Sequence, residues 1–214
     1  MGNDLSAIIE KYIDDHTDDL SPLLSELVKE TEEATGHSRW SIGKVEGKFL
    51  QMLVKISGAR NAVEIGTFTG YSALIIAGAL PEDGRLITCE TDERHAEIAL
   101  RYFKKSASGS KIRLEFGPAL ETLRPLADNS VDFVFIDADK PSYSRYFDEA
   151  LRILKSGGLI LVDNVFWRNK IFIQPITNKN ARAIAAFNEK VKNEDRAEKV
   201  MLSVRDGVYL IRKK

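Results

Sequence analysis

The chain has 214 residues, which is enough for one sizeable α/β domain with a buried core and too few for two domains of ordinary size. Its 31 basic and 32 acidic residues leave a net charge of −1, so no global field would attract nucleic acid or an anionic membrane, and we expect a small-molecule substrate. The single cysteine, Cys89, excludes a disulfide within the chain. Since no apolar stretch approaches the ~20 residues of a membrane span, we expect a soluble, cytoplasmic protein.

Three helical stretches precede the first predicted strand, over residues 5–15, 21–35 and 45–57. The second is the best marked, because Ser21 and Pro22 are typical of a helix start and Gly36 of a helix end. We predict that the chain forms one domain, 1–214, in which residues 1–40 are a helical cap on a core of residues 41–214. Such helices can fold over the ligand-binding edge of a sheet, where Trp40 would be either a lid or part of the core.

The stretch 62–72, AVEIGTFTGYS, predicts a strand, a tight loop and the start of a helix. Gly66 and Gly70 permit positive φ and close approach of the backbone to a ligand, and Glu64 stands at the carboxyl end of the strand. A dinucleotide fingerprint would be GxGxxG with its acid well downstream, whereas the spacing here is ExGxxxG. An acid inside the motif suits a positively charged ligand without phosphate, such as S-adenosylmethionine, although a plain turn would need the same glycines.

Beyond this loop, apolar strands alternate with helices as far as the strand GLILVD at 158–163. Such alternation with short connections predicts a parallel sheet covered by helices on both faces, the α/β doubly wound class of Rossmann-like proteins. The last two strands, EKVMLSV and GVYLIRK, flank a turn signal at Asp206 and Gly207. We therefore predict that these two strands are antiparallel neighbours.

Acidic residues follow four of the predicted strands: Glu64, Glu90, Asp137 and Asp163. Ligands of open α/β sheets bind beyond the carboxyl ends of the strands, so this pattern predicts a site at that edge. Glu90 follows Gly70 by 20 residues and could accept the ribose hydroxyls of an adenosine, whether from NAD or from S-adenosylmethionine.

If the strands before Asp137 and Asp163 are adjacent, these carboxylates and the Asn164 amide can meet at one ion. An all-oxygen set favours Mg²⁺, Mn²⁺ or Ca²⁺, and the three histidines are too scattered for a zinc site. Lys140 follows Asp137 by three residues. A divalent cation nearby would favour the neutral, proton-accepting form of this lysine, which could then serve as a general base; the alternative is a solvated lysine at a helix start.

Six segments of the chain together resemble the cation-dependent O-methyltransferases of the caffeoyl-coenzyme A and catechol type. They are AVEIGTFTGYS, ITCETD, GPALETL, VDFVFIDADKPSYSRYF, GGLILVDNVFW and RDGVYLIRK, and the similarity runs from about Ser41 to the end. The resemblance implies a class I fold with a seven-stranded sheet whose last strand is antiparallel. It also implies S-adenosylmethionine and a divalent cation as cofactors, and a homodimer.

By position, the resemblance implies that eight residues bind S-adenosylmethionine: Ile42, Glu64, Gly66, Tyr71, Ser72, Glu90, Ala119 and Asp137. It implies metal ligation by Asp137, Asp163 and Asn164 and a catalytic role for Lys140. The chain departs from the plant enzymes at DADKP, where those have DADKDNY. It departs again at 169–178, which we predict to line the acceptor pocket.

The expected activity is methyl transfer from S-adenosylmethionine to one hydroxyl of a vicinal diphenol of the catechol or caffeoyl type. The metal would chelate both hydroxyl oxygens while Lys140 accepts the proton. An NAD-dependent short-chain reductase is one alternative, but its YxxxK pair should lie on a helix, and the only such pair, Tyr209 and Lys213, lies on the final strand. A non-catalytic adenosine-binding protein is another alternative, against which the presence of Lys140 argues.

Overall fold

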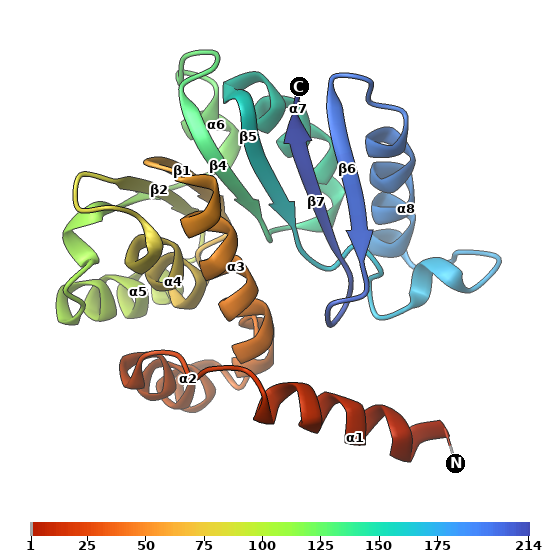
Figure 1. Ribbon diagram of the computed structural model, residues 1–214, viewed down its shortest axis with the longest axis horizontal. Coiled ribbons are helices and arrows are strands. Elements are labelled where there is room, and N and C mark those ends of the chain that lie inside the picture. The colour runs from red at the N-terminus through yellow and green to blue at the C-terminus, as the bar shows by residue number, and fades with distance from the viewer. Residues whose placement is uncertain (1) are drawn as a thin grey trace.

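The computed structural model describes residues 2–214, with only the backbone described at positions 2–4 and 6 (Figure 1). The helices are α1 (Gly2–Asp15), α2 (Pro22–Thr35), α3 (Lys44–Ser57), α4 (Tyr71–Ala79), α5 (Glu93–Lys105), α6 (Ala119–Leu123), α7 (Tyr143–Ile153) and α8 (Lys179–Lys192). The strands are β1 (Asn61–Ile65), β2 (Arg85–Glu90), β3 (Ile112–Phe116), β4 (Val131–Ile136), β5 (Leu154–Val162), β6 (Ala197–Leu202) and β7 (Val208–Lys213). The predicted elements are confirmed, with ends that differ by a few residues.

The strands form one seven-stranded sheet in the order β3-β2-β1-β4-β5-β7-β6. All neighbouring pairs from β3 to β5 are parallel, and β7 runs antiparallel to both β5 and β6. The α/β class, the antiparallel last strand and the pairing of the last two strands are thereby confirmed. The order reverses between β1 and β4, so the crossovers leave to opposite sides there and open a crevice at the carboxyl ends of these strands.

The strands bury alternate side chains on the two faces of the sheet. Val134 and Ile136 of β4 belong to one cluster of buried residues, together with apolar residues of α6, α7 and α8. Phe133 and Phe135 belong to a second cluster, formed with α2, α3, α4 and α5. Because successive side chains of a strand point to opposite faces, both faces of a central strand must be apolar, which explains the nearly continuous apolar runs.

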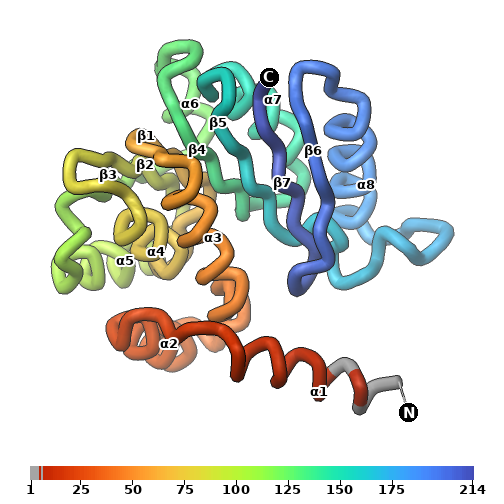
Figure 2. The backbone as a smooth tube through the Cα atoms, in the orientation of Figure 1, coloured from red at the N-terminus to blue at the C-terminus, as the bar shows by residue number. Residues whose placement is uncertain are grey.

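The N-terminal helices lie across the edge of the sheet at which the parallel strands end (Figure 1), and the tube in Figure 2 shows the C-terminal end on the opposite side. Ser21 caps α2 by accepting from the Leu23 amide, and Gly36 ends it with a φ of 67°. Close packing of α3 against α4 depends on Gly47, where a Cβ would lie 2.8 Å from Cδ1 of Ile75. Among the described residues, no helix has both the length and the apolar character needed to cross a membrane.

Candidate active site

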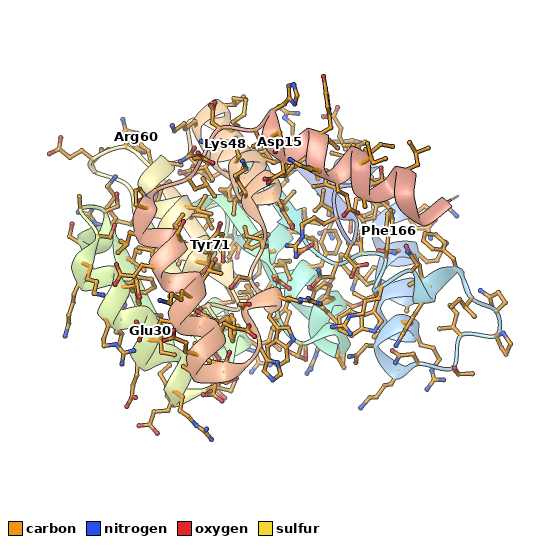
Figure 3. The ribbon with its side chains drawn as sticks, turned by 90° about the horizontal axis from the view of Figure 1, so that it is seen from below. Asp15, Glu30, Lys48, Arg60, Tyr71 and Phe166 are labelled. Atoms are coloured by element: carbon orange, nitrogen blue, oxygen red, sulfur yellow. The ribbon has the colours of Figure 1, made fainter. Side chains whose placement is uncertain are left out.

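A cavity of about 840 Å³ opens at the carboxyl ends of the parallel strands. Its walls come from the loop after β1, the ends of β2, β4 and β5, the segment before α3, and the loop between β6 and β7. Figure 3 views the molecule from this side, with α1 and α2 in the foreground. Ten of the eleven predicted site residues line the cavity: Ile42, Gly66, Tyr71, Ser72, Glu90, Ala119, Asp137, Lys140, Asp163 and Asn164. Glu64 does not line it.

The register of the sheet explains why these residues meet. Ile65 of β1 pairs with Cys89 of β2 and with Ile136 of β4, and Ile136 pairs with Val162 of β5. The residues that follow these positions therefore emerge side by side at one edge. The expected adjacency of the strands before Asp137 and Asp163 is thus confirmed.

The two glycines of the loop after β1 have backbone conformations that other residues rarely adopt. Gly66 has a φ of 100°, and a Cβ on it would lie 2.0 Å from the Asp137 carbonyl oxygen. Gly70 has a φ of 96°, and a Cβ there would lie 2.7 Å from the Phe103 ring. Both positions require glycine because the loop packs against the backbone after β4 and against α5. These glycines therefore shape the cavity through packing within the protein.

Glu64 lies behind the cavity wall rather than in it. Its side chain is fully buried, Oε2 accepts from Thr88 Oγ1 at 2.5 Å, and Oε1 has no hydrogen-bond donor among the described residues. Burial raises the pKa of this carboxyl to about 8. A buried acceptor without a donor is costly, so a ligand ammonium reaching it past Ser72 would remove a penalty already present in the fold.

Glu90 is held by three backbone amides at the end of β2. Oε2 accepts from the Phe68 amide at 2.7 Å, and Oε1 accepts from the amides of Thr91 and Asp92 at 2.8 and 2.9 Å. The carboxylate thus ties β2 to the glycine loop and faces the cavity in a fixed orientation. Each carboxylate oxygen can accept about two hydrogen bonds, so Oε2 retains one free lone pair for a ligand hydroxyl.

Four aromatic rings form a row along the rim beside Glu90. Trp40 stacks on His37 at a centroid distance of 4.2 Å and lies 5.7 Å from Phe68, which in turn meets the edge of His95 at 4.6 Å. Trp40 is 53% exposed and lines the cavity. Of the two roles considered for Trp40, the core is therefore wrong, and a lid stays a prediction.

Lys140 lies at the centre of the polar cluster at the ends of β4 and β5. Its Nζ donates to Asp137 Oδ1 at 2.8 Å, to Asn164 Oδ1 at 2.8 Å and to the Tyr143 hydroxyl at 2.5 Å. The side chain is only 6% exposed, and Nζ lies 5.5 Å from the centroid of Trp167. Solvation at a helix start is therefore wrong, because this ammonium is enclosed by oxygen acceptors and an aromatic ring.

Asp163 is almost completely buried in the same cluster, where its Oδ1 accepts from the Asn164 amide at 2.5 Å. Burial, followed by the nearby carboxyls of Glu46 and Asp137, raises the pKa of Asp163 well above its ordinary value. Asn164 itself has a φ of 59°. Nowhere in the described chain do three His, Cys, Asp or Glu side chains group as metal ligands; the set expected here includes the Asn164 amide oxygen.

The loop after β5 contributes fewer residues to the main cavity than the sequence predicts. Trp167 and Arg168 line the main cavity, but no residue of 169–178 does, so the prediction that this segment lines the acceptor pocket is wrong. Lys170, Ile173 and their neighbours line a separate hollow of about 290 Å³. The physical reason is the turn through Trp167, Arg168 and Asn169, all with positive φ, which directs the chain away from the cavity. Asn178 still contributes indirectly, because its Oδ1 accepts from Trp167 Nε1 at 3.0 Å.

Comparison with known sequences identifies the family of the chain. A family model described as O-methyltransferase matches residues 14–214. The chain belongs to this O-methyltransferase family. Caffeoyl-CoA O-methyltransferase 1 of Eucalyptus globulus is 37% identical over 205 residues, covering 90% of this chain and 83% of that protein. Caffeoyl-CoA O-methyltransferase 2 of Petunia hybrida is 36% identical over 206 residues, covering 90% and 85%.

Solved structures of similar proteins agree with this assignment. The O-methyltransferase from Bacillus cereus, in complex with SAH, has a TM-score of 0.87 and 31% identity, covering 97% of each chain. The O-methyltransferase TomG from Streptomyces achromogenes, in complex with SAM, has a TM-score of 0.86 and 26% identity, covering 96% of each chain. The chain is thus an O-methyltransferase with the fold of these enzymes.

Three functional candidates in this O-methyltransferase were missed from the sequence: Glu46, Tyr143 and Arg205. Glu46 and Tyr143 are fully buried, and Arg205 and Glu46 form an ion pair at 3.0 Å between residues 159 apart in the chain. Glu46 falls in an amphipathic helix, where a charged residue is ordinarily assumed to be solvated. The adjacent Gly47 was the available signal, since it allows α3 to pack closely enough to bury its neighbour.

Proposed function

We propose that this O-methyltransferase transfers the methyl group of S-adenosylmethionine to one hydroxyl of a vicinal diphenol, with a divalent cation at Asp137, Asp163 and Asn164. One observation carries the proposal: a single cavity joins the glycine loop to the cluster around Lys140. The donor and the acceptor can therefore meet within one cavity. The names of the caffeoyl-CoA relatives support a phenolic acceptor.

The residues on the β1 side fit the proposed methyl donor. Glu64 supplies a buried carboxyl with a free acceptor, which suits an ammonium group, and Glu90 supplies an oriented carboxylate, which suits a ribose hydroxyl. Ala119 and Tyr71 border the space between them, and the aromatic row at Trp40 borders the rim. This half lacks the phosphate-binding glycine pattern of a dinucleotide site, which also favours S-adenosylmethionine over NAD.

The residues on the β4–β5 side fit a hard cation. Asp137 Oδ1 and Asn164 Oδ1 already converge on one positive charge, the Lys140 ammonium, at 2.8 Å each. The donors are oxygens of two carboxylates and one amide, the chemistry that Mg²⁺, Mn²⁺ and Ca²⁺ prefer. A cation bound there would supply charge that favours ionisation of the diphenol.

Lys140 then acts as the general base. Its Nζ donates to Tyr143, Asp137 and Asn164, and as an ammonium it cannot accept a proton. A cation bound at Asp137 and Asn164 would favour the neutral amine, which could then take the proton of the phenol. The phenol oxygen gains the methyl carbon as the carbon–sulfur bond breaks, and S-adenosylhomocysteine leaves. Trp167 gives a flat wall 5.5 Å from Nζ, which suits an aromatic acceptor.

Neither of the two alternative functions is favoured by the arrangement of these residues. Tyr209 belongs to the buried cluster on the α7–α8 face, and Lys213 Nζ donates to the carbonyls of Leu151 and Leu154. This pair is therefore not placed for hydride transfer in the cavity, and nothing favours a reductase. A purely binding role leaves the enclosed Lys140 without a purpose.

A methyl-transfer assay with labelled S-adenosylmethionine tests the proposal. We expect label on catechol and on caffeoyl esters, loss of transfer with EDTA, and recovery when Mg²⁺ or Mn²⁺ is added back. Resorcinol is the matched control, because its hydroxyls are not adjacent and cannot share one ion. Equal methylation of resorcinol, or transfer unaffected by EDTA, would contradict chelation of the acceptor.

Homodimer formation is a separate proposal that rests mainly on the family resemblance. The structure contributes apolar side chains that α1 exposes, including Ile8, Tyr12 and Ile13. We expect a dimer mass by light scattering at micromolar concentration. A monomer under these conditions would overturn the proposal without affecting the proposed chemistry.

A further inference from the structure

An ion pair that the proposed chemistry does not use lies at the edge of the cavity, between a fully buried glutamate and an arginine whose side chain is 39% exposed and lines the cavity. Glu46, in the first turn of α3, is 0% exposed, and its Oε2 accepts from Nη1 of Arg205 at 3.0 Å. Arg205 stands between β6 and β7 with a φ of 47°, an uncommon conformation for a residue other than glycine. A strained backbone and a fully buried carboxylate therefore meet at one contact.

Each member of the pair also touches a different part of the site. Arg205 Nη1 donates to the carbonyl oxygen of Ser41 at 3.3 Å, next to the predicted cofactor residue Ile42. The Glu46 carboxyl is close enough to Asp163 to help raise the pKa of that carboxyl, and Glu46 Oε1 is buried without a hydrogen-bond partner among the described residues. The pair thus connects the segment that borders the donor to a predicted metal ligand.

Stability alone does not account for this arrangement. The other buried positions that follow on α3, Leu50 and Val54, are apolar, so the core of this helix does not require an acid. Burial of the Glu46 carboxylate costs desolvation free energy, which a pair with a partly exposed arginine offsets only in part. Groups behind metal ligands, in contrast, commonly orient them, and their loss weakens metal binding.

We propose that Glu46 and Arg205 are positioning residues that hold Asp163 and the Ser41–Ile42 segment in one arrangement. The metal site and the methyl-donor site would then keep a fixed position relative to each other. This inference rests on the proposed function, since it assigns Asp163 to the metal and Ile42 to the donor. Neither Glu46 nor Arg205 touches the reacting atoms in this scheme; both act through the groups that they hold.

Binding measurements on three variants test the inference, with Mn²⁺ affinity read by electron paramagnetic resonance and S-adenosylhomocysteine affinity by calorimetry. Glu46→Leu and Arg205→Met should each weaken both affinities by about 10- to 100-fold, as the loss of a group behind a metal ligand does. Glu46→Gln should keep the affinities of the parent, because an amide can accept from Arg205 and donate to Asp163. Parent-like affinities in Glu46→Gln would show that Glu46 acts through its hydrogen bonds and not through its negative charge.

Asp132→Leu is the matched control, because Asp132 is a largely buried acid that accepts from the amides of Arg60 and Asn61, and it does not line the cavity. It should lower the melting temperature without changing either affinity. Parent-like Mn²⁺ and S-adenosylhomocysteine affinities in folded Glu46→Leu and Arg205→Met would overturn the inference. If the parent bound no Mn²⁺, the proposed metal would fail, and the S-adenosylhomocysteine arm alone would decide whether the pair positions the donor segment.

Discussion

The two halves of the cavity are built in different ways. The donor half comes mostly from one continuous stretch, β1 with the loop to α4. The Glu90 carboxylate accepts from the Phe68 amide of that loop and from the amides of the two residues that follow Glu90. The metal half draws on four separated segments, since Lys140 meets Asn164, Glu46 meets Arg205, and Tyr143 donates to the Asp163 carbonyl. Local chain geometry makes the first half, and tertiary packing makes the second.

Backbone conformation shows the same contrast. In the donor half the positive φ angles fall mainly on Gly66 and Gly70, where they cost little. In the metal half they fall on non-glycine residues, namely Asn164, Trp167, Arg168, Asn169 and Arg205. Strain of this kind persists only where surrounding contacts hold it. The metal half should therefore be the more sensitive to distant substitutions.

The largest expected effect is on turnover, from Lys140→Met. Methionine keeps the length and apolar stem of lysine but cannot accept a proton, and loss of a general base typically lowers kcat by about 10²- to 10⁴-fold. Mn²⁺ binding should survive, since Asp137, Asp163 and Asn164 remain. Raising the pH should partly restore kcat, because hydroxide replaces the base. Asp163→Ala is the variant to compare with Lys140→Met. Its kcat should also fall sharply, but because metal affinity is lost, so raising the pH at trace metal concentration should not restore it.

A smaller effect is expected from Glu90→Ala in the donor half. Losing a charged hydrogen bond of about 1.5–3 kcal/mol should raise the Kd for S-adenosylhomocysteine by about 10- to 100-fold, measured by calorimetry. Mn²⁺ affinity should not change, because Glu90 belongs to the other half. Glu115→Ala on β3 is a suitable control, since Glu115 pairs with Arg113 and does not line the cavity. Unchanged S-adenosylhomocysteine binding in Glu90→Ala would remove Glu90 from the site.

The same contrast explains what could be predicted from the sequence. Alternation of apolar strands and helices was sufficient to predict the α/β class, and the acids at strand ends were sufficient to predict that Asp137 and Asp163 lie at one edge of the sheet, because both follow from residues close in the chain. Glu46 and Arg205 could not be predicted, since their contact depends on how closely α3 packs and on where the β6–β7 loop lies. The segment 169–178 was misplaced because three consecutive positive φ angles have no signature in residues such as Trp167 and Arg168.

Glu64 should give the donor half a pH-dependent stability. Its pKa is about 8 in the folded protein against an ordinary 4.5, so between these values the folded state retains a proton that the unfolded state has lost. Stability therefore falls as pH rises through this window and levels off above about 8, with a slope of at most ~1.4 kcal/mol per pH unit. Denaturant unfolding at pH 6.5 and 7.5 should show a decrease of about 1 kcal/mol in the parent relative to Glu64→Gln. Parallel pH profiles would show that Glu64 ionises normally.

The smallest expected effect is that of metal removal on folding. Asp137 is paired with Lys140 and Glu46 with Arg205, and the raised pKa of Asp163 favours its neutral form, so removing a cation leaves little unbalanced charge. At about ten times its Kd, Mg²⁺ would stabilise the fold by only ~1.4 kcal/mol, or a few degrees in Tm.

Melts in EDTA should accordingly stay cooperative and lie only a few degrees below those in Mg²⁺. Complete unfolding by the chelator would instead make the ion structural. Lys140→Met sharpens the comparison, because without its ammonium the carboxylate of Asp137 faces Asp163 with no cation between them except the metal. The Mg²⁺-dependent rise in Tm should therefore be larger in Lys140→Met than in the parent, whereas Glu90→Ala should leave it unchanged. An equal rise in all three proteins would mean that Lys140 does not balance the charge of the metal half.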